Sequence, residues 1–386
     1  MNRRHETEIN QIREHGLLRA LRPLPAAGGK ITVGGRTVLN FSSNDYLNLA
    51  GDERLKAGAT EAVRKYGCGA TASRLMSGSL DLHSLLEQRL AQFLGHEAAL
   101  VFGSGYLANL GVLSALAGRG DHIFADKLSH ASLLDGAALS KAGLHRYRHN
   151  DPNHLEVLLR RCDGSGRKLI VAESVFSMDG DIAPVEELAG LAKAFDAILM
   201  IDEAHAVGVF GEGGSGLCRA CAKGVDIVIG TLSKSLGGYG GLAACNEATR
   251  ELLINRARSF IYSTALPPAC LGSALAAIEI IRQEPDLGRQ LLKRAEHFRA
   301  LLGQLGFDTL TSQSQIVPVL VGDNKKAMAL SEALFGDGVL AVAVRPPTVP
   351  AGTARLRFSV TLAHEPDDLE VAAQALGRCA KKVGLL

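Results

Sequence analysis

The sequence predicts an α/β protein, with a large doubly wound, mostly parallel sheet domain and a smaller α+β domain at the C-terminus. Apolar, β-branched runs alternate with helical patterns from about residue 98 to residue 250, as parallel strands with right-handed crossovers require. Several of these runs end in ionisable side chains, and strand patterns lie between helices beyond residue 285. We expect an N-terminal arm and hairpin over residues 1–40, the large domain over 41–284 and the small domain over 285–386.

Three elements are expected before the sheet begins. Residues 5–22 form an amphipathic arm, because their apolar side chains recur at helical spacing. Residues 31–39 read as a β-hairpin around a Gly-Gly pair. Leucines and a phenylalanine at helical spacing predict a helix over residues 82–94, which Gly95 closes.

The C-terminal part changes character after a long helix over residues 269–282. The Gln-Glu-Pro-Asp stretch at 283–286 indicates a domain boundary there. Beyond it, strands are expected near residues 316–321, 339–344 and 356–360, each between helices. This pattern is typical of a small α+β domain.

Composition narrows the classes of function. A chain of 386 residues has ample core volume for two or three domains, and a net charge of +2 favours neither nucleic acid nor a membrane surface. No apolar stretch approaches the ~18 residues of a transmembrane helix. An odd number of scattered cysteines favours the reducing cytoplasm. Cys218 and Cys221 form one isolated C-x-x-C pair, so we expect no metal site.

Lys234 is the residue around which the chemistry is organised. It follows the apolar run at 226–231 and precedes four glycines within 237–241. A lysine at such a strand end can lose its proton through desolvation and condense with a carbonyl group. A solvated loop lysine is the ordinary interpretation of one such residue, but groups at other strand ends favour the chemical interpretation.

Asp202 ends a second buried run, at 197–202. A carboxylate at the carboxyl end of a parallel strand can bind a metal, act as a base, cap a helix or pair with a ring nitrogen. Pyridoxal phosphate requires the last of these, because an acidic partner keeps its pyridine ring protonated. His205 lies three residues further on and could reach the phenolic oxygen of the same ring.

Phosphate donors are expected in the segment at 102–109, where small residues separate a strand from a helix. Backbone N–H groups and the helix dipole can face an anion at such a turn, although a Gly-Ser-Gly sequence can also be a plain turn. The spacing departs from the G-x-G-x-x-G of dinucleotide sites. Thr231 and Ser233 add hydroxyls, and His130 lies at another strand-to-helix junction, able to stack on an aromatic ring.

In this order the motifs resemble those of fold-type I pyridoxal-phosphate enzymes and, within them, the α-oxoamine synthase family. The resemblance runs from about residue 9 to the C-terminus. It departs from the family in the glycine string at 67–72 and at Ala206. The matching strings are Asn-Phe-Ser-Ser-Asn-Asp-Tyr-Leu at 40–47, Ser-His-Ala-Ser at 129–132, Phe-Ser-Met-Asp-Gly at 176–180, Asp-Glu-Ala-His at 202–205, Ile-Tyr-Ser-Thr at 261–264, Arg-Pro-Pro-Thr at 345–348 and Ala-His-Glu at 363–365.

The resemblance implies roles for single residues. Lys234 matches the lysine that forms the Schiff base, Asp202 the partner of the pyridine nitrogen, and His205 the contact to the phenolic oxygen. His130 matches the ring-stacking histidine. The further cofactor contacts are Gly105, Tyr106, Ser177 and Thr231, together with Ser263 and Thr264 supplied by the other subunit of a homodimer.

Substrate contacts are implied in the same way. Arg357 matches the arginine whose bidentate fork binds the amino-acid carboxylate. Asn44, His130 and Thr348 are expected to contact substrate, with an N-terminal arginine on the acyl chain. Arg19 is the favoured position for that arginine, and Arg22 fits nearly as well.

The activity that the resemblance implies is a decarboxylative condensation of L-alanine with a pimeloyl thioester, as in biotin biosynthesis. The amine of Lys234 would remove the α-proton of the amino acid, and the carbanion would attack the thioester at high effective molarity. His130 would bind the keto-acid carboxylate or polarise the thioester carbonyl. The alternatives are a sister synthase using another amino acid and acyl-CoA (a glycine C-acetyltransferase or 5-aminolevulinate synthase type), an aminotransferase or aldolase, and a non-enzymatic nucleotide-binding module.

Overall fold

The computed structural model describes residues 2–25, 28–162, 165–221 and 224–385. The chain divides into two compact units. One, here called the sheet unit, comprises Leu47–Ser177 and Ile182–Gln290, and the other, the terminal unit, comprises Met1–Tyr46, Met178–Asp181 and Leu291–Leu386. The expected domain boundaries after residues 40 and 284 stay predictions, because a unit defined by contacts need not fold alone.

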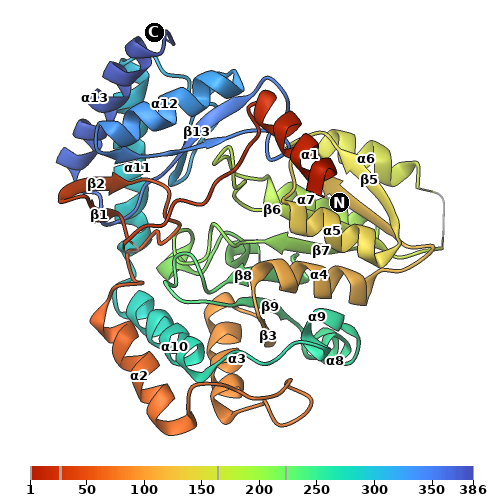
Figure 1. The fold of residues 1–386 in the computed structure, drawn as a ribbon. Helices are drawn as coiled ribbons and strands as arrows, with labels where there is room; N and C mark the ends of the chain where they lie inside the picture. Colours follow the sequence, from red (N-terminus) through yellow and green to blue (C-terminus); the bar gives the residue numbers. More distant parts are fainter. Residues whose placement is uncertain (1, 26–27, 163–164, 222–223, 386) are drawn as a thin grey trace. The chain divides into compact units, whose positions relative to one another are not determined.

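A seven-stranded sheet lies at the centre of the sheet unit, in the order β3-β9-β8-β7-β6-β4-β5 among the described residues (Figure 1). Neighbouring strands from β8 to β5 are parallel, and β9 runs antiparallel to both β3 and β8. The predicted doubly wound, mostly parallel sheet is therefore confirmed. The strands are β3 (Ala98–Phe102), β4 (His122–Asp126), β5 (Gly143–Tyr147), β6 (Lys168–Glu173), β7 (Ala197–Asp202), β8 (Ile227–Thr231) and β9 (Gly241–Cys245).

Both faces of this sheet are covered. Leu100 and Ile229 belong to a buried core that includes Val112 of α4 and Leu133 of α5. Val101 is equally buried although its side chain points to the opposite face, as alternation along a strand requires. Burying each such side chain stabilises the fold by about 1.5–3 kcal/mol. The helices are α2 (Glu53–Tyr66), α3 (Asp81–Leu94), α4 (Gly105–Leu116), α5 (Ala131–Ser140), α6 (Pro152–Arg160), α7 (Val185–Ala194), α8 (Glu247–Arg256), α9 (Arg258–Ile261) and α10 (Pro268–Gln283), with short 3-10 helices at Glu212–Gly214 and Cys218–Cys221.

Helix boundaries follow from local capping. Helix α4 begins after Ser104, whose side chain accepts a hydrogen bond from the N–H of Leu107. Helix α5 begins after His130, whose ring accepts a hydrogen bond from the N–H of Ser132. Helix α3 ends before Gly95, which takes the left-handed conformation with φ 77°. The predicted helix over residues 82–94 is confirmed.

The terminal unit contains two small sheets. Strands β1 and β2 form the predicted hairpin, and its two glycines, Gly34 and Gly35, both have positive φ, as the two-residue turns that match strand twist require. Strand β11 adds to β2 in parallel, and β10, β13 and β12 form an antiparallel sheet. The elements are α1 (Asn2–Glu14), β1 (Lys30–Val33), β2 (Arg36–Asn40), α11 (Leu287–Gln304, from Leu291 on), β10 (Ile316–Gly322), α12 (Asn324–Gly336), β11 (Val339–Leu340), β12 (Val342–Val344), β13 (Ala354–Ser359) and α13 (Pro366–Lys382).

The prediction of one strand over residues 339–344 is wrong. The chain leaves one sheet and enters the other at Ala341, because Leu340 pairs with β2 while Val342 pairs with β13. The carbonyl of Ala341 accepts a hydrogen bond from the Ser331 hydroxyl at 2.6 Å instead of from a strand. An apolar run does not reveal such a transfer, since both sheets require the same burial.

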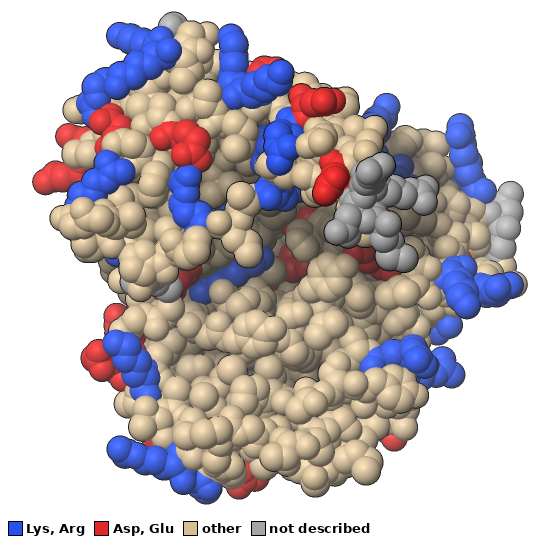
Figure 2. All heavy atoms as spheres, viewed as in Figure 1, with Lys and Arg blue, Asp and Glu red and all other residues tan. Residues whose placement is uncertain are grey.

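The predicted N-terminal arm is helical only as far as Glu14. Of its apolar side chains, Ile9 and Ile12 are exposed, and Leu21 is 98% exposed. In the described ranges, none of the helices combines the length and the apolar character needed to span a bilayer. Figure 2 shows acidic and basic side chains interspersed over the face in view, with few of either around α3 and α10.

Candidate active site

A cavity of about 250 Å³ lies at the carboxyl ends of the central strands of the sheet unit. Glu173, Asp202 and Thr231 line it and are the last residues of β6, β7 and β8. Ligand sites of parallel sheets lie at this edge. The cavity is lined by Ser104, Gly105, Tyr106, Asn109, His130, Ser132, Glu173, Asp202, Ala204, His205, Thr231, Ser233 and Lys234.

Lys234 and His205 meet inside this cavity. The Nζ atom of Lys234 lies 2.7 Å from Nε2 of His205, within hydrogen-bonding distance. His205 is buried and Lys234 is half-buried. The hydrogen bond restrains a long, flexible side chain, so the amine points at one place in the cavity.

The carboxylate of Asp202 is buried and held at both oxygens. Its Oδ1 accepts a hydrogen bond from the backbone N–H of Ala204 at 2.8 Å. Its Oδ2 accepts a hydrogen bond from the side-chain amide of Asn109 at 2.7 Å. These two hydrogen bonds fix the orientation of the carboxylate, which can pair with a cationic ring nitrogen.

Asn109 links the aspartate to the histidine at the mouth of the cavity. Its amide also donates to the Ser132 hydroxyl at 2.8 Å, and that hydroxyl lies 2.8 Å from Nδ1 of His130. The Oδ1 atom of Asn109 is buried without a hydrogen-bond partner among the described residues. We did not predict roles for Asn109 or Ser132, and the available signal was a single amide on the apolar helix α4.

Glu173 also lines the cavity, and we had not assigned it a role. Its carboxylate accepts hydrogen bonds from the N–H groups of His130, at 2.7 Å, and Ser177, at 3.2 Å. Burial, followed by the nearby charge of Asp202, raises the pKa of Glu173 to about 8. The side chain therefore keeps its proton at neutral pH and adds no second negative charge beside Asp202.

His130 is exposed at the cavity, yet the protein atoms around its ring lower the pKa of its imidazole. Desolvation is the main cause, with a partly opposing contribution from Asp202. The ring is consequently neutral at pH 7. Because Nδ1 accepts a hydrogen bond from the N–H of Ser132, Nε2 carries the hydrogen and can donate it to a ligand.

The cavity also offers donors for an anion. They are the first residues of α4 and the hydroxyl of Ser233, which lies 2.7 Å from the hydroxyl of Thr231. The Thr231 hydroxyl itself donates to the Gly240 carbonyl at 2.9 Å, so of these two side chains Ser233 can donate to a ligand. A Cβ atom on Gly105 would lie 3.4 Å from Cβ of Thr231, so a larger residue would crowd this turn. Helix N–H groups and a hydroxyl in this arrangement suit a phosphate. Tyr106 lines the cavity as well, with its hydroxyl bonded to Asp135.

Other predicted cofactor contacts lie outside this lining. Ser177 is buried beside Glu173, where its N–H is engaged. Thr264 is exposed and forms an isolated β-bridge with Ser73, and Ser263 is half-buried. The structure thus gathers Gly105, Tyr106, His130, Asp202, His205, Thr231 and Lys234 around one cavity, whereas Ser177, Ser263 and Thr264 do not line it.

Arg357 is held in the terminal unit by neutral oxygens. Its guanidinium donates to the side chains of Asn44 at 3.1 Å, Ser359 at 2.6 Å and Tyr46 at 3.3 Å. Burial raises the pKa of Tyr46, although the Arg357 charge opposes this effect. The predicted pair Asn44 and Arg357 is therefore in direct contact.

The remaining predicted substrate residues are also in the terminal unit. The N–H of Thr348 donates to the carbonyl of Arg345 at 3.1 Å. Arg19 is exposed, and after desolvation its charge is the second cause of a lowered pKa of Arg345. Arg22 forms an ion pair with Glu332 at 2.6 Å, so binding a substrate through Arg22 would require this ion pair to break.

Comparisons with known proteins find chains of similar sequence and structure. Residues 36–376 match the family model of aminotransferase class I and II. The 8-amino-7-oxononanoate synthase of Geobacter sulfurreducens is 48% identical over 392 residues, covering 100% of both chains. A serine palmitoyltransferase from S. paucimobilis with bound PLP superposes with a TM-score of 0.93 at 32% identity, covering 99% of this chain and 98% of that one. The 8-amino-7-oxononanoate synthase of Francisella tularensis superposes with a TM-score of 0.77 at 32% identity, covering 89% and 98%.

Proposed function

The chain belongs to the aminotransferase class I and II family, and on that premise we propose that it is an acyltransferase that uses pyridoxal 5'-phosphate. It condenses L-alanine with a pimeloyl thioester to give 8-amino-7-oxononanoate and carbon dioxide, and releases coenzyme A or a carrier-protein thiol. The observation that carries this proposal is the single cavity in which Lys234, Asp202 and an anion site converge.

The residues of the cavity fit the three functional parts of this cofactor. Lys234 suits the aldehyde, the buried carboxylate of Asp202 suits the ring nitrogen, and the start of α4 with Ser233 suits the phosphate. Asn109 already positions the Asp202 carboxylate, so that part of the site is preorganised. When bound, pyridoxal phosphate supplies an aldehyde that links to amines and a ring that accepts electron density from the adjacent carbon.

Proton transfer is the task of Lys234 and His205. The amine of Lys234 takes the proton from the α-carbon of the amino acid and later returns one to the product. His205 shares a hydrogen bond with that amine at 2.7 Å, so it keeps the nitrogen aimed and can exchange a proton with it.

His130 is placed to act on the acyl substrate. Its Nε2–H is available as a donor because Nδ1 is engaged with Ser132. A neutral imidazole donates to a developing oxyanion without a change of net charge, which suits a thioester carbonyl under attack. Arg357, fixed by Asn44, binds a substrate carboxylate, and Arg19 with Thr348 contacts the acyl chain.

We assign the substrates from sequence identity to relatives and not from structural similarity. The serine palmitoyltransferase superposes more closely than the Francisella tularensis synthase, yet both are 32% identical to this chain. The 48% identity over the full length of the Geobacter sulfurreducens synthase favours alanine and a pimeloyl thioester over the substrates of a sister synthase.

A homodimer with shared sites is part of the proposal. Leu75 and Met76 are 52% and 79% exposed, and Tyr262 is 71% exposed. They flank the bridge between Ser73 and Thr264 in the sequence, so an apolar surface surrounds the residues expected to reach the partner's cavity. Mixing a Lys234→Ala protein with a Thr264→Glu protein would restore roughly a quarter of the parental activity if sites are shared, because random pairing makes one intact site in each mixed dimer.

A substrate panel tests the reaction directly. The holoenzyme is incubated with pimeloyl-CoA, or with pimeloyl carrier protein, and with L-alanine, glycine or L-serine, and the products are identified by mass. We expect product with L-alanine. Its mass should equal that of alanine plus pimelic acid, less one water and one carbon dioxide. Product from glycine or L-serine alone would assign the chain to a sister synthase, and product without an acyl thioester would contradict acyl transfer.

A further inference from the structure

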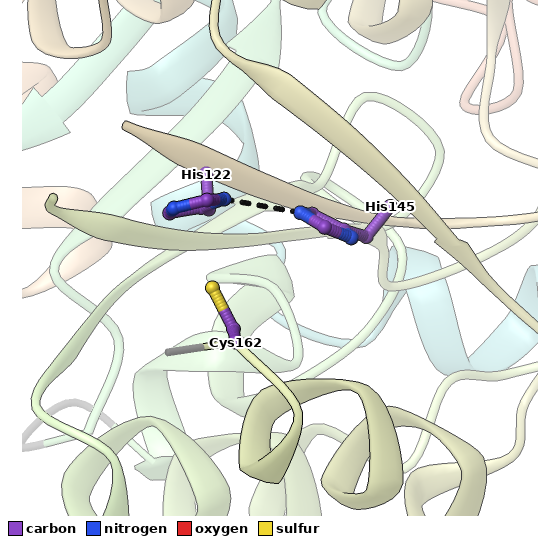
Figure 3. Close-up of side chains that lie close together, drawn as sticks. All are labelled: His122, His145 and Cys162. Atoms are coloured by element: carbon purple, nitrogen blue, oxygen red, sulfur yellow. Dashed lines mark hydrogen bonds between the residues drawn. The ribbon is translucent and has the colours of Figure 1, made fainter. Parts of the chain in front are cut away.

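A second group of ligand-type side chains lies at the far end of the sheet strands from the active-site cavity. His122 begins β4, His145 lies in the middle of the edge strand β5, and Cys162 follows α6 (Figure 3). One ligand atom from each lies within 4.8 Å of the other two. Figure 3 shows the thiol of Cys162 directed toward the two imidazoles.

Strand register places the two histidines on the same face of the sheet. His122 pairs with Gly143, and Phe124 pairs with His145, so the imidazoles meet diagonally across two parallel strands. The Nδ1 atom of His122 lies 3.1 Å from the Nε2 atom of His145. A Cβ atom at Gly143 would lie 3.4 Å from Nδ1 of His122 and 3.6 Å from Nε2 of His145, so glycine leaves the space beside both nitrogens open.

Both sides of the group are held in place. The His145 ring stacks on Phe124 with centroids 4.8 Å apart. Cys162 is half-buried, and its N–H donates to the carbonyl of Leu159 at the end of α6. The three ligands therefore come from elements that the fold already fixes.

We propose that His122, His145 and Cys162 bind a zinc ion through two imidazole nitrogens and one thiolate, with solvent as the fourth ligand. This donor set suits zinc, whereas Mg²⁺ and Ca²⁺ require oxygen ligands. Tetrahedral zinc with bonds of about 2.0–2.3 Å separates its ligand atoms by about 3.3–3.8 Å, which small side-chain rotations reach here. The thiol proton is released to solvent as the Zn–S bond forms, and the metal replaces the hydrogen bond between the imidazoles.

The ion would join the edge strand β5, its neighbour β4 and the end of α6. It has no part in the condensation reaction, so the proposal is independent of the function assigned to the cavity. We had expected no metal site, and these ligands carry no motif, since the histidines are 23 residues apart. Zinc at a large excess over its dissociation constant should raise the Tm of the protein by roughly 3–6 °C, because it binds only the folded chain.

Metal binding is measured on the holoenzyme after treatment with a chelator. Zinc affinity is read by competition with a chromophoric chelator, and thiolate ligation by the near-ultraviolet absorption that appears when Co²⁺ is added, relative to metal-free holoenzyme. We expect one zinc per chain, a thiolate-to-cobalt band, and at least a roughly tenfold loss of affinity in both Cys162→Ser and His145→Asn. The matched control is Cys68→Ser, which removes an exposed cysteine elsewhere.

The circular dichroism spectrum of each variant shows that it has folded, whatever reaction the cavity carries out. If folded Cys162→Ser or His145→Asn protein binds zinc as tightly as the parent, the metal lies elsewhere and the proposal is wrong. Absence of stoichiometric zinc binding to the parent, or a cobalt spectrum without a thiolate band, would overturn it as well. A Tm increase that is lost in Cys162→Ser and kept in Cys68→Ser supports it.

Discussion

Replacing Asn109 with alanine tests whether the hydrogen bonds among the lining residues hold the carboxylate of Asp202. The amide of Asn109 is buried and donates to Asp202 at 2.7 Å and to Ser132 at 2.8 Å. Alanine removes both hydrogen bonds and leaves one oxygen of a buried carboxylate without this donor. The connection from Asp202 to His130 is broken at the same time.

The size of the effect follows from the two bonds. A hydrogen bond to a charged group contributes about 1.5–3 kcal/mol, and one between neutral groups about 0.5–1.5 kcal/mol. Water entering the vacated space recovers part of this sum, so we expect the free energy of unfolding to fall by about 2–3 kcal/mol. A less well oriented carboxylate should also raise the Kd for pyridoxal phosphate by roughly 10–100-fold, since about 1.4 kcal/mol corresponds to a factor of ten.

Urea unfolding of the apoprotein measures the first quantity, and titration with pyridoxal phosphate measures the second. Asn255→Ala is the matched control, because this exposed amide on α8 donates to the Glu251 carbonyl, and its loss should change stability by less than about 0.5 kcal/mol. If Asn109→Ala lowers stability without changing the Kd, the amide supports the fold and does not position Asp202. Parental values for both quantities would refute the network altogether.

Two further predictions concern buried ionisable side chains. Glu173 has a raised pKa in the folded state, so its contribution to the free energy of unfolding is complete below pH 4.5 and is lost as the pH rises toward 8. Glu173→Gln should therefore make the free energy of unfolding depend less on pH across that range. An unchanged slope would contradict the raised pKa. The ion pair between Arg74 and Glu87, 2.8 Å apart, is almost fully buried. Arg74→Met should lower the free energy of unfolding by about 3 kcal/mol. Arg160→Met, which breaks an exposed ion pair with Glu156, should lower it by less than about 1 kcal/mol. Equal decreases in the two variants would show that burial of the pair does not matter here.

The parts of the site that the sequence could predict are those at strand ends. Asp202 and Lys234 follow apolar runs whose length and composition mark buried strands, and parallel strands bring their carboxyl ends to one edge. Local signals are enough for this. The order of the motifs then identified the family, because few arrangements place a lysine, an aspartate and a histidine in that sequence.

Contacts between elements could not be predicted in the same way. Asn109 is a single amide in a helix, and nothing local shows that it reaches a strand 93 positions away in the chain. The transfer between sheets at Ala341 leaves the apolar pattern unchanged. His122 and His145 meet only because β4 and β5 pair in one particular register. Side-chain partners of this kind depend on tertiary packing, which periodicity does not encode.

The covalent attachment of the cofactor tests the account most directly. The purified protein is supplied with pyridoxal phosphate, reduced with borohydride and digested, and the modified peptide is located by mass spectrometry. The account predicts one pyridoxyl group per chain on Lys234, beside His205, and a visible absorption band that disappears on reduction. A label on another lysine, or a protein that stays colourless and unmodified, would contradict it.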